Sequence, residues 1–146
     1  MIATILVAVD DSAAAFCAAA EATQLCAALG AGLVVVGVVP DGARAERLGA
    51  VSGVPDPQTR QVMSAAAVLR HVESAAAGAG VKVRTRCLAG HPAEQVLAEA
   101  RRCSADLIVI ARADRHGMGL PYIGTQAQRI LEFAGVPVLV VPPPEP

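Results

Sequence analysis

Short hydrophobic runs alternate along this chain with longer stretches of helical periodicity. Runs rich in Val, Ile and Leu occupy residues 2–9, 33–39, 107–111 and 138–141, and residues 81–88 form a fifth, half-polar run. Between them, apolar residues recur at intervals of three and four, which is the spacing of amphipathic helices. The pattern therefore predicts five strands and four helices in strict alternation.

The predicted helices have recognisable start and stop signals. Ser12 is expected to cap a first helix over residues 13–29. A second helix is predicted over residues 57–77, a third opens at Gly90-His91-Pro92, and a fourth begins at Gly124-Thr125. Their expected inner faces are Ala18, Ala22, Leu25, Cys26 and Leu29; Val62, Ala66, Leu69, Val72 and Ala76; Val96, Leu97, Ala100 and Cys103; and Ala127, Ile130, Leu131 and Ala134.

The alternation of strands and helices implies a parallel sheet covered on both faces. In the run at residues 81–88, Lys82, Arg84 and Arg86 occupy alternate positions, so we place this strand at an edge of the sheet. Right-handed crossovers then leave few strand orders. We predict one doubly wound, Rossmann-like α/β domain over residues 1–142, with a five-stranded parallel sheet in the order 3-2-1-4-5 and a proline-rich tail at residues 143–146.

This strand order predicts where a ligand would bind. The chain reverses direction between the first and fourth strands, and ligands of such sheets bind beyond the carboxyl ends of the strands at that point. Asp10 and Asp11 follow the first strand, and a loop follows the fourth strand after Ala111. Two segments distant in sequence are therefore expected to meet in one crevice. Residues 40–57, which contain three Pro and three Gly, are expected to form an irregular connection.

Composition and charge narrow the class of function. The 146 residues carry a net charge of −1 and are 54% hydrophobic but only 2% aromatic. This charge provides no field that would attract nucleic acid or membrane, and few aromatic rings are present to stack on bases. The apolar runs fall short of the roughly 20 residues that a membrane helix needs, and no basic region precedes the first one. We expect a cytoplasmic protein that binds neither nucleic acid nor membrane.

Four cysteines show neither a CxxC spacing nor a histidine at zinc-site spacing. We interpret Cys17, Cys26, Cys87 and Cys103 as reduced core thiols, with a disulfide or redox role as the alternative. The sequence predicts no metal site.

Four segments, taken in order, carry a family resemblance. Residues 5–12 form an apolar strand followed by an acidic turn, and residues 34–40 form a second apolar strand. Residues 90–110 contain a helix and a strand, and residues 136–141 contain a closing strand. In this order and spacing they resemble the universal stress protein family over essentially the whole chain. The resemblance implies an adenine nucleotide alpha hydrolase-like fold, a role in stress response and a homodimer through the last strand.

The nucleotide-binding branch of that family has a glycine, two residues, a second glycine, nine residues and then Gly-Ser or Gly-Thr. Gly124-Thr125 fits the end of this motif, but Ala111 and Asp114 stand at the two earlier glycine positions. Asp114 adds a Cβ and a negative charge where a polyphosphate would lie. One like-charge contact near 4 Å costs about 4 kcal/mol at an effective dielectric of 20. Alternatively, Asp114 pairs with a neighbouring arginine, or the glycines at 117 and 119 shift the loop register.

The resemblance also implies which residues would surround a nucleotide. Asp10 would lie near the ribose and the metal-bound phosphates, or would simply be a turn carboxylate. The backbone of Val38 would meet the adenine ring, or Val38 would be a plain core residue. Gly124 and Thr125 open a helix whose N–H groups favour an anion, or form an ordinary helix start. The complete candidate set is Ala8, Val9, Asp10, Val38, Ala111, Arg112, Asp114, Gly124, Thr125 and Gln126.

Basic residues offer two further candidate surfaces. Arg112, Arg115 and His116 make the loop after the fourth strand basic, which suits a phosphate, an acidic partner or a solvated surface. The cations at positions 82, 84 and 86 are most simply the solvent-exposed side chains of an edge strand. Their spacing also suits a basic surface that binds a partner.

Two functional hypotheses follow. In the first, the protein acts in stress response as a homodimer that binds an unidentified protein partner, with no cofactor and with impaired or absent ATP binding. In the second, it is an adenine-nucleotide-binding regulator that holds ATP with Mg²⁺ in a remodelled loop and hydrolyses it slowly at most. The uncharged edge Val138–Val141 supports a dimer in both, because an unpaired apolar edge invites aggregation. An enzyme is disfavoured, because no nucleophile, base and orienting group can be assigned.

Overall fold

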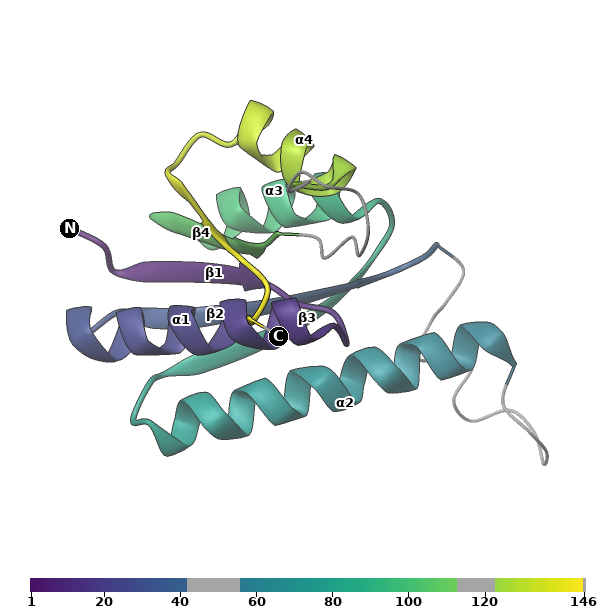
Figure 1. Ribbon diagram of the computed structural model, residues 1–146, viewed down its shortest axis with the longest axis horizontal. Coiled ribbons are helices and arrows are strands. Elements are labelled where there is room, and N and C mark those ends of the chain that lie inside the picture. Colours follow the sequence, from purple (N-terminus) through teal and green to yellow (C-terminus); the bar gives the residue numbers. More distant parts are fainter. Residues whose placement is uncertain (42–55, 113–122, 146) are drawn as a thin grey trace.

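The computed structural model describes residues 1–41, 56–112 and 123–145. Within these ranges the strands are β1 (Thr4–Ala8), β2 (Gly32–Val39), β3 (Val83–Ala89), β4 (Leu107–Ala111) and β5 (Val138–Val141). The helices are α1 (Ala13–Leu29), α2 (Pro57–Gly78), α3 (Pro92–Arg102) and α4 (Thr125–Phe133). All strand pairings are parallel, in the order β3-β2-β1-β4-β5, which confirms the predicted topology (Figure 1). Most of the expected connection at residues 40–57 lies outside the described residues.

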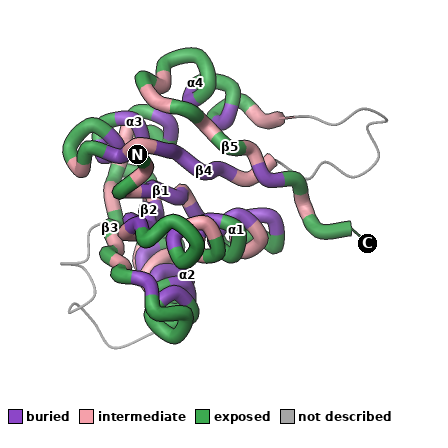
Figure 2. The backbone as a smooth tube through the Cα atoms, turned by 90° about the vertical axis from the view of Figure 1, so that its left-hand side faces the viewer, coloured by how far each residue is buried: buried purple, intermediate pink, exposed green. Residues whose placement is uncertain are grey.

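The sheet separates two hydrophobic layers (Figure 2). Odd-numbered strand residues such as Ile5, Val35 and Val109 pack with α1 and α2, whereas even-numbered residues such as Leu6 and Ile108 pack with α3 and α4. Successive side chains of a strand point to opposite faces, so a strand covered on both faces must be apolar at every position. The continuous apolar runs of β1, β2 and β4 meet this requirement.

The N-terminal residues are tied to the start of β4 by one carboxylate. Asp106 Oδ2 accepts hydrogen bonds from the backbone N–H groups of Ala3, at 2.9 Å, and Thr4, at 3.0 Å. These two donors favour the charged form and hold the pKa of Asp106 below its usual value. Asp106 therefore fixes where β1 begins beside β4.

Some predicted core positions are wrong. Leu29 and Leu131 are exposed, whereas Ala134, just beyond α4, is half-buried and packs against the layer formed with α3 and α4. Leu29 is the last residue of α1, and Leu131 flanks the narrow buried stripe of α4, which Ala127 and Ile130 form.

No helix among the described residues is both long and apolar enough to span a membrane.

The four cysteines are free thiols in different environments. Cys26 is a core thiol, and burial raises its pKa to about 11. Cys17 and Cys103 are half-buried, and Cys87 is exposed on β3, so the prediction of a core position is wrong for Cys87. Cys87 is exposed because it lies near the end of an edge strand.

A buried carboxylate connects α3 to β3. Glu99 on α3 has a side chain only 3% exposed, and it accepts hydrogen bonds from Arg102, with Nε at 2.8 Å from Oε2. Arg86 on β3 lies beside it, with Nε 3.4 Å from Oε1. The hydrogen bonds from Arg102 outweigh burial, so the pKa of Glu99 is lowered. Arg86 therefore belongs to an ion cluster and is not merely a solvated edge residue.

We predict that Glu99→Gln lowers the free energy of unfolding by about 1–2 kcal/mol at pH 7, because the two guanidinium groups lose a charged acceptor but stay partly solvated. The lowered pKa means that the contribution of Glu99 is complete above its unfolded-state pKa and is lost as the pH falls through its folded-state pKa. Urea denaturation between pH 3 and 7 measures the difference, which should shrink below pH ~4. Glu21→Gln, on the exposed surface of α1, is the control; equal effects at the two positions would contradict the prediction.

Candidate functional site

The chain reverses direction between β1 and β4, and two hollows open beyond the carboxyl ends of the neighbouring strands. Asp10 follows β1 and Arg112 follows β4. Asp10 lines both hollows, so the two spaces meet at one carboxylate. The structure thus brings together the two sequence segments that were expected to form a crevice.

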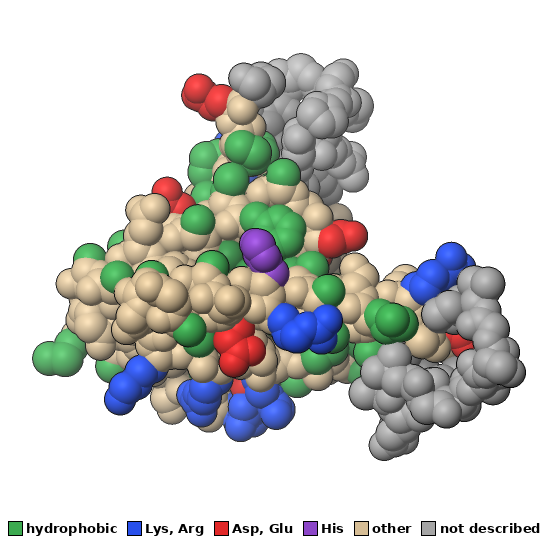
Figure 3. Space-filling view, turned by 90° about the horizontal axis from the view of Figure 1, so that it is seen from below, with side chains coloured by type: hydrophobic (Ala, Val, Ile, Leu, Met, Phe, Trp, Pro, Cys, Tyr) green, Lys and Arg blue, Asp and Glu red, His purple; other side chains and the backbone are tan. Residues whose placement is uncertain are grey.

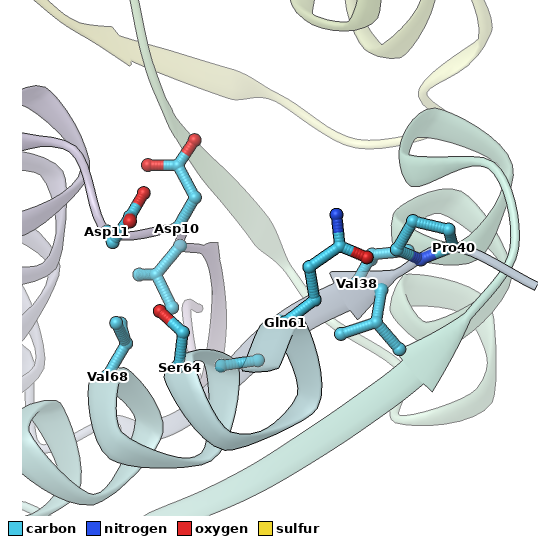
Figure 4. Close-up of a pocket in the computed structure, with 11 residues that line it drawn as sticks. Asp10, Asp11, Val38, Pro40, Gln61, Ser64 and Val68 are labelled. Carbon is cyan, nitrogen blue, oxygen red and sulfur yellow. The ribbon is translucent and has the colours of Figure 1, made fainter. Parts of the chain in front are cut away.

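The first space, the β1–β2 hollow, has a volume of about 310 Å³. Figure 4 shows Asp10 and Asp11 on one side of it and Gln61 and Ser64 of α2 on the other, with the Asp10 carboxylate pointing away from α2. Apolar atoms of Val38 and neighbouring residues line its floor. The lining residues are Val9, Asp10, Asp11, Gly37, Val38, Val39, Pro40, Gln61, Ser64, Ala65 and Val68.

The second space, the β1–β4 hollow, has a volume of about 460 Å³ and lies where two helices begin. Ala13 and Ala14 are the first residues of α1, and Thr125 and Gln126 are the first residues of α4. Helix N-termini carry unpaired N–H groups and a partial positive charge, so this hollow favours an anion. Its lining residues are Asp10, Ser12, Ala13, Ala14, Ala111, Arg112, Ile123, Gly124, Thr125, Gln126 and Ala127.

Asp10 and Ser12 shape the turn that leads into α1. Ser12 caps the helix, since its Oγ accepts a hydrogen bond from the Ala15 N–H at 3.1 Å. Asp10 Oδ1 accepts a hydrogen bond from the Ser12 N–H at 2.9 Å. One oxygen of Asp10 thus stabilises the turn, and the carboxylate still lines both hollows. The structural role and the proposed ligand-binding role of Asp10 are therefore compatible.

Gly124 positions the start of α4. It has φ +94° and ψ +148°, a conformation that residues with a Cβ rarely adopt. Its carbonyl accepts a hydrogen bond from the Gln128 N–H at 3.0 Å, which begins the helix. Glycine is therefore required here by the backbone itself, whatever the hollow contains.

Gln126 has a structural contact that the sequence did not suggest. Its side-chain oxygen accepts a hydrogen bond from the Ala93 N–H, at 3.0 Å, in the first turn of α3. The residue at the N-cap position of α3, His91, makes no side-chain capping bond. Gln126 therefore caps a neighbouring helix, and its side-chain oxygen is already engaged on that side of the hollow.

The structure gathers most of the predicted site residues. Val9 and Val38 line the β1–β2 hollow, while Asp10 lines both. Ala111, Arg112, Gly124, Thr125 and Gln126 line the β1–β4 hollow. Ala8 is half-buried at the end of β1, packs on the α3–α4 side and lines neither hollow. Asp114, Arg115 and His116 lie outside the described residues.

Sequence reasoning missed the contribution of α2. Gln61 and Ser64 face Asp10 and Asp11 across the β1–β2 hollow. They lie at i and i+3 on one side of the helix, which is a detectable pattern, but nothing in the sequence shows which end of the sheet that side meets.

No cluster of three or more potential metal ligands occurs in the described ranges.

Comparison with known proteins identifies the chain's relatives. Residues 1–142 match the Universal stress protein family. A stretch of 77 residues, 53% of this chain, is 36% identical to the universal stress protein MJ0531 of Methanocaldococcus jannaschii. The match covers only 45% of that protein, so the chain spans less than half the length of this relative.

Solved structures share the architecture over nearly the whole chain. The universal stress protein UspA from Lactobacillus plantarum is 23% identical, with a TM-score of 0.78 over 96% of this chain and 97% of that one. A universal stress protein from Archaeoglobus fulgidus in complex with dAMP is 22% identical, with a TM-score of 0.70 over 97% and 99% of the two chains. At these identities the likeness shows a shared fold.

We predict that Gly124→Ala lowers the free energy of unfolding by about 1–2 kcal/mol, because alanine is strained at this positive φ. Gly135→Ala is a matched control, since its backbone does not have such a φ and an added Cβ would meet no atom within 4 Å. Thermal or urea denaturation of the two variants gives the comparison. Equal stabilities would show that the N-terminus of α4 tolerates a side chain.

Proposed function

This chain belongs to the universal stress protein family, and we propose that it acts there as a dimeric regulatory protein with impaired ATP binding. The observation that carries the proposal is the presence of Ala111 and Asp114 at the two glycine positions of the family's phosphate loop. In this proposal the protein works by contact with a protein partner, and any nucleotide hydrolysis is slow at most.

The two replacements act on different properties of the loop. Glycine lets backbone N–H groups come close to phosphate oxygens and permits positive φ. Ala111 ends β4 and lines the β1–β4 hollow, where an added methyl group is a modest steric change. Asp114 follows three residues later in the sequence and adds a negative charge to the phosphate-loop motif. A triphosphate carries several negative charges, so Asp114 disfavours it more than it would disfavour a nucleoside or a monophosphate.

A second candidate function is adenine-nucleotide binding through a remodelled loop. It is favoured by the features that the chain retains: Gly124, the two helix N-termini at the β1–β4 hollow and the adjoining β1–β2 hollow. The dAMP complex of the Archaeoglobus fulgidus protein supports a mononucleotide as the ligand to test beside ATP. In this alternative, the base would occupy the β1–β2 hollow next to Val38, and the phosphate would lie near Gly124.

The dimer proposal rests on the outer edge of β5, which pairs with β4 alone among the described strands. The carbonyls of Pro137 and Val141 accept hydrogen bonds from the N–H groups of Ile108 and Arg112, at 3.0 and 2.8 Å. The backbone groups of the even-numbered residues between them therefore face away from the sheet. These outward groups belong to Val138 and Val140, and no side chain of β5 is charged. Leu139 is also 37% exposed. Pairing with β5 of a second copy would satisfy the backbone groups and cover this apolar edge.

We predict that the wild-type protein binds ATP with Mg²⁺ at no better than millimolar affinity. The double variant Ala111→Gly and Asp114→Gly should bind at least about a hundredfold more tightly, because one close like-charge contact and one methyl group are removed. Isothermal titration calorimetry with ATP, and separately with AMP, measures both proteins.

Ala134→Gly with Asp41→Gly is the control double variant, since it makes the same composition change at two residues that line neither hollow, and it should bind ATP as the wild type does. Micromolar ATP binding by the wild type would contradict impaired binding and favour the second candidate. Micromolar AMP binding without ATP binding would limit the impairment to the polyphosphate.

We predict that the protein is a dimer in solution and that Leu139→Lys shifts it towards monomer. The substitution places a charge on an apolar edge that pairing would bury. Size-exclusion chromatography with light scattering, over a dilution series, gives the mass. Leu29→Lys, at the exposed end of α1, is the matched control and should remain dimeric. A Leu139→Lys variant as dimeric as the wild type would exclude β5 as the interface.

A further inference from the structure

β3 forms the second edge of the sheet, opposite β5, and its outer backbone groups can be identified. It pairs with β2 alone among the described strands. The Lys82 carbonyl accepts a hydrogen bond from Leu33, at 2.8 Å, and the Gly90 N–H donates to Val39, at 2.9 Å. Even-numbered residues of β3 therefore bond to β2, and odd-numbered residues turn their N–H and C=O groups outward. The outward groups belong to Val83, Thr85, Cys87 and Ala89.

The side chains of β3 divide between the two faces of the sheet. Val83 packs into the layer formed with α1 and α2, while Leu88 packs into the layer formed with α3 and α4. By the same alternation, Arg84 and Arg86 lie on the α3 side, and the contact between Arg86 and Glu99 of α3 agrees with this. Arginines therefore recur every second residue beside the open backbone edge.

Positive charge dominates this border of the molecule. Figure 3 views the molecule from below and shows Lys and Arg side chains gathered along the lower border of that view. Lys82, Arg84 and Arg86 are exposed, and Arg102 of α3, whose side chain is 55% exposed, adds a fourth cation. Glu99 is the carboxylate that contacts this group, and it is buried beneath Arg86 and Arg102. The cluster of these five residues has a net charge of +3.

We propose that the edge of β3 binds an extended acidic segment of a partner protein, which adds to the sheet as a sixth strand. The outward N–H and C=O groups of Val83, Thr85 and Cys87 would bond to its backbone. Carboxylates at alternate positions of the segment would lie beside Arg84 and Arg86, because directly opposed side chains of neighbouring strands have Cβ atoms about 5 Å apart. In this proposal the backbone groups of β3 supply affinity for the partner segment, and its arginines supply selectivity for acidic side chains.

The same charge disfavours the other occupants of this edge. A second copy of β3 would place arginine beside arginine, which repels the pair. A nucleic acid has no N–H and C=O ladder with which to satisfy the odd-numbered residues, and the described part of this surface has no aromatic side chain for stacking. An acidic strand satisfies both the backbone and the cations. This surface is separate from the crevice and from β5, so the proposal stands or falls independently of nucleotide binding and of the dimer.

A fluorescein-labelled peptide of about eight residues that alternates Thr with Glu tests the proposal against the full chain by fluorescence anisotropy. We expect saturable binding that Arg84→Glu weakens by at least about tenfold, because an attraction becomes a repulsion. Arg129→Glu, on α4, makes the same charge change far from β3 and should bind as the wild type does. In hydrogen exchange, the peptide should protect the outward amides of Thr85 and Cys87.

Two further comparisons separate strand addition from simple charge attraction. A peptide N-methylated at every second amide keeps its charge but cannot donate along the edge, so it should bind at least about tenfold more weakly. Thr85→Pro removes an outward N–H while leaving the bonds to β2 in place, and it should have the same effect. Equal binding by the methylated peptide, or by Arg84→Glu, would overturn the proposal. Tighter binding of a single-stranded oligonucleotide of equal charge, lost in Arg84→Glu, would overturn it in favour of nucleic acid.

Discussion

Burial of the central strands on both faces is the constraint on which the rest of this structure depends. Ile5, Leu6 and Val7 of β1 have no exposed surface, and the neighbouring strands are nearly as enclosed. A polar side chain in the middle of such a strand would lose its hydration without gaining a partner. Polar and charged side chains therefore lie at the ends of the strands and at the edges of the sheet. Asp10 after β1 and the arginines of β3 occupy these two kinds of position.

The sequence was sufficient to predict the strand order because one strand differs from the others. Alternating cations at 82, 84 and 86 mark β3 as an edge, and the right-handed crossover rule then leaves few arrangements. Side-chain contacts between distant elements were harder to predict. Nothing in the sequence marks Glu99 as buried, and only the folded chain brings Arg86 beside it. Leu131 was misplaced because periodicity gives the direction of a buried stripe but not its width.

The candidate site was predictable to the extent that it follows from topology. Asp10 and the loop after Ala111 follow strands beside the point where the chain reverses, so a general rule for open sheets locates them. Val38 and Gly124 were implied by the family resemblance. Gln61 and Ser64 had no comparable marker, since their position depends on how far α2 extends past β2. Gln126 was placed in the correct hollow, but its bond to Ala93 depends on the distance between two helices. That distance is set by packing and has no local sequence signal.

α3 is held at two points along its length by groups that belong to different surfaces. Near its start, the Ala93 N–H donates to Gln126, which lies in the helix that borders the β1–β4 hollow. Six residues later, about 9 Å along the axis, Glu99 contacts Arg86 of the edge strand. A helix of this length behaves as a rigid rod, so these two attachments cannot move independently. The crevice and the edge of β3 are therefore mechanically connected through α3, even though no residue lines both.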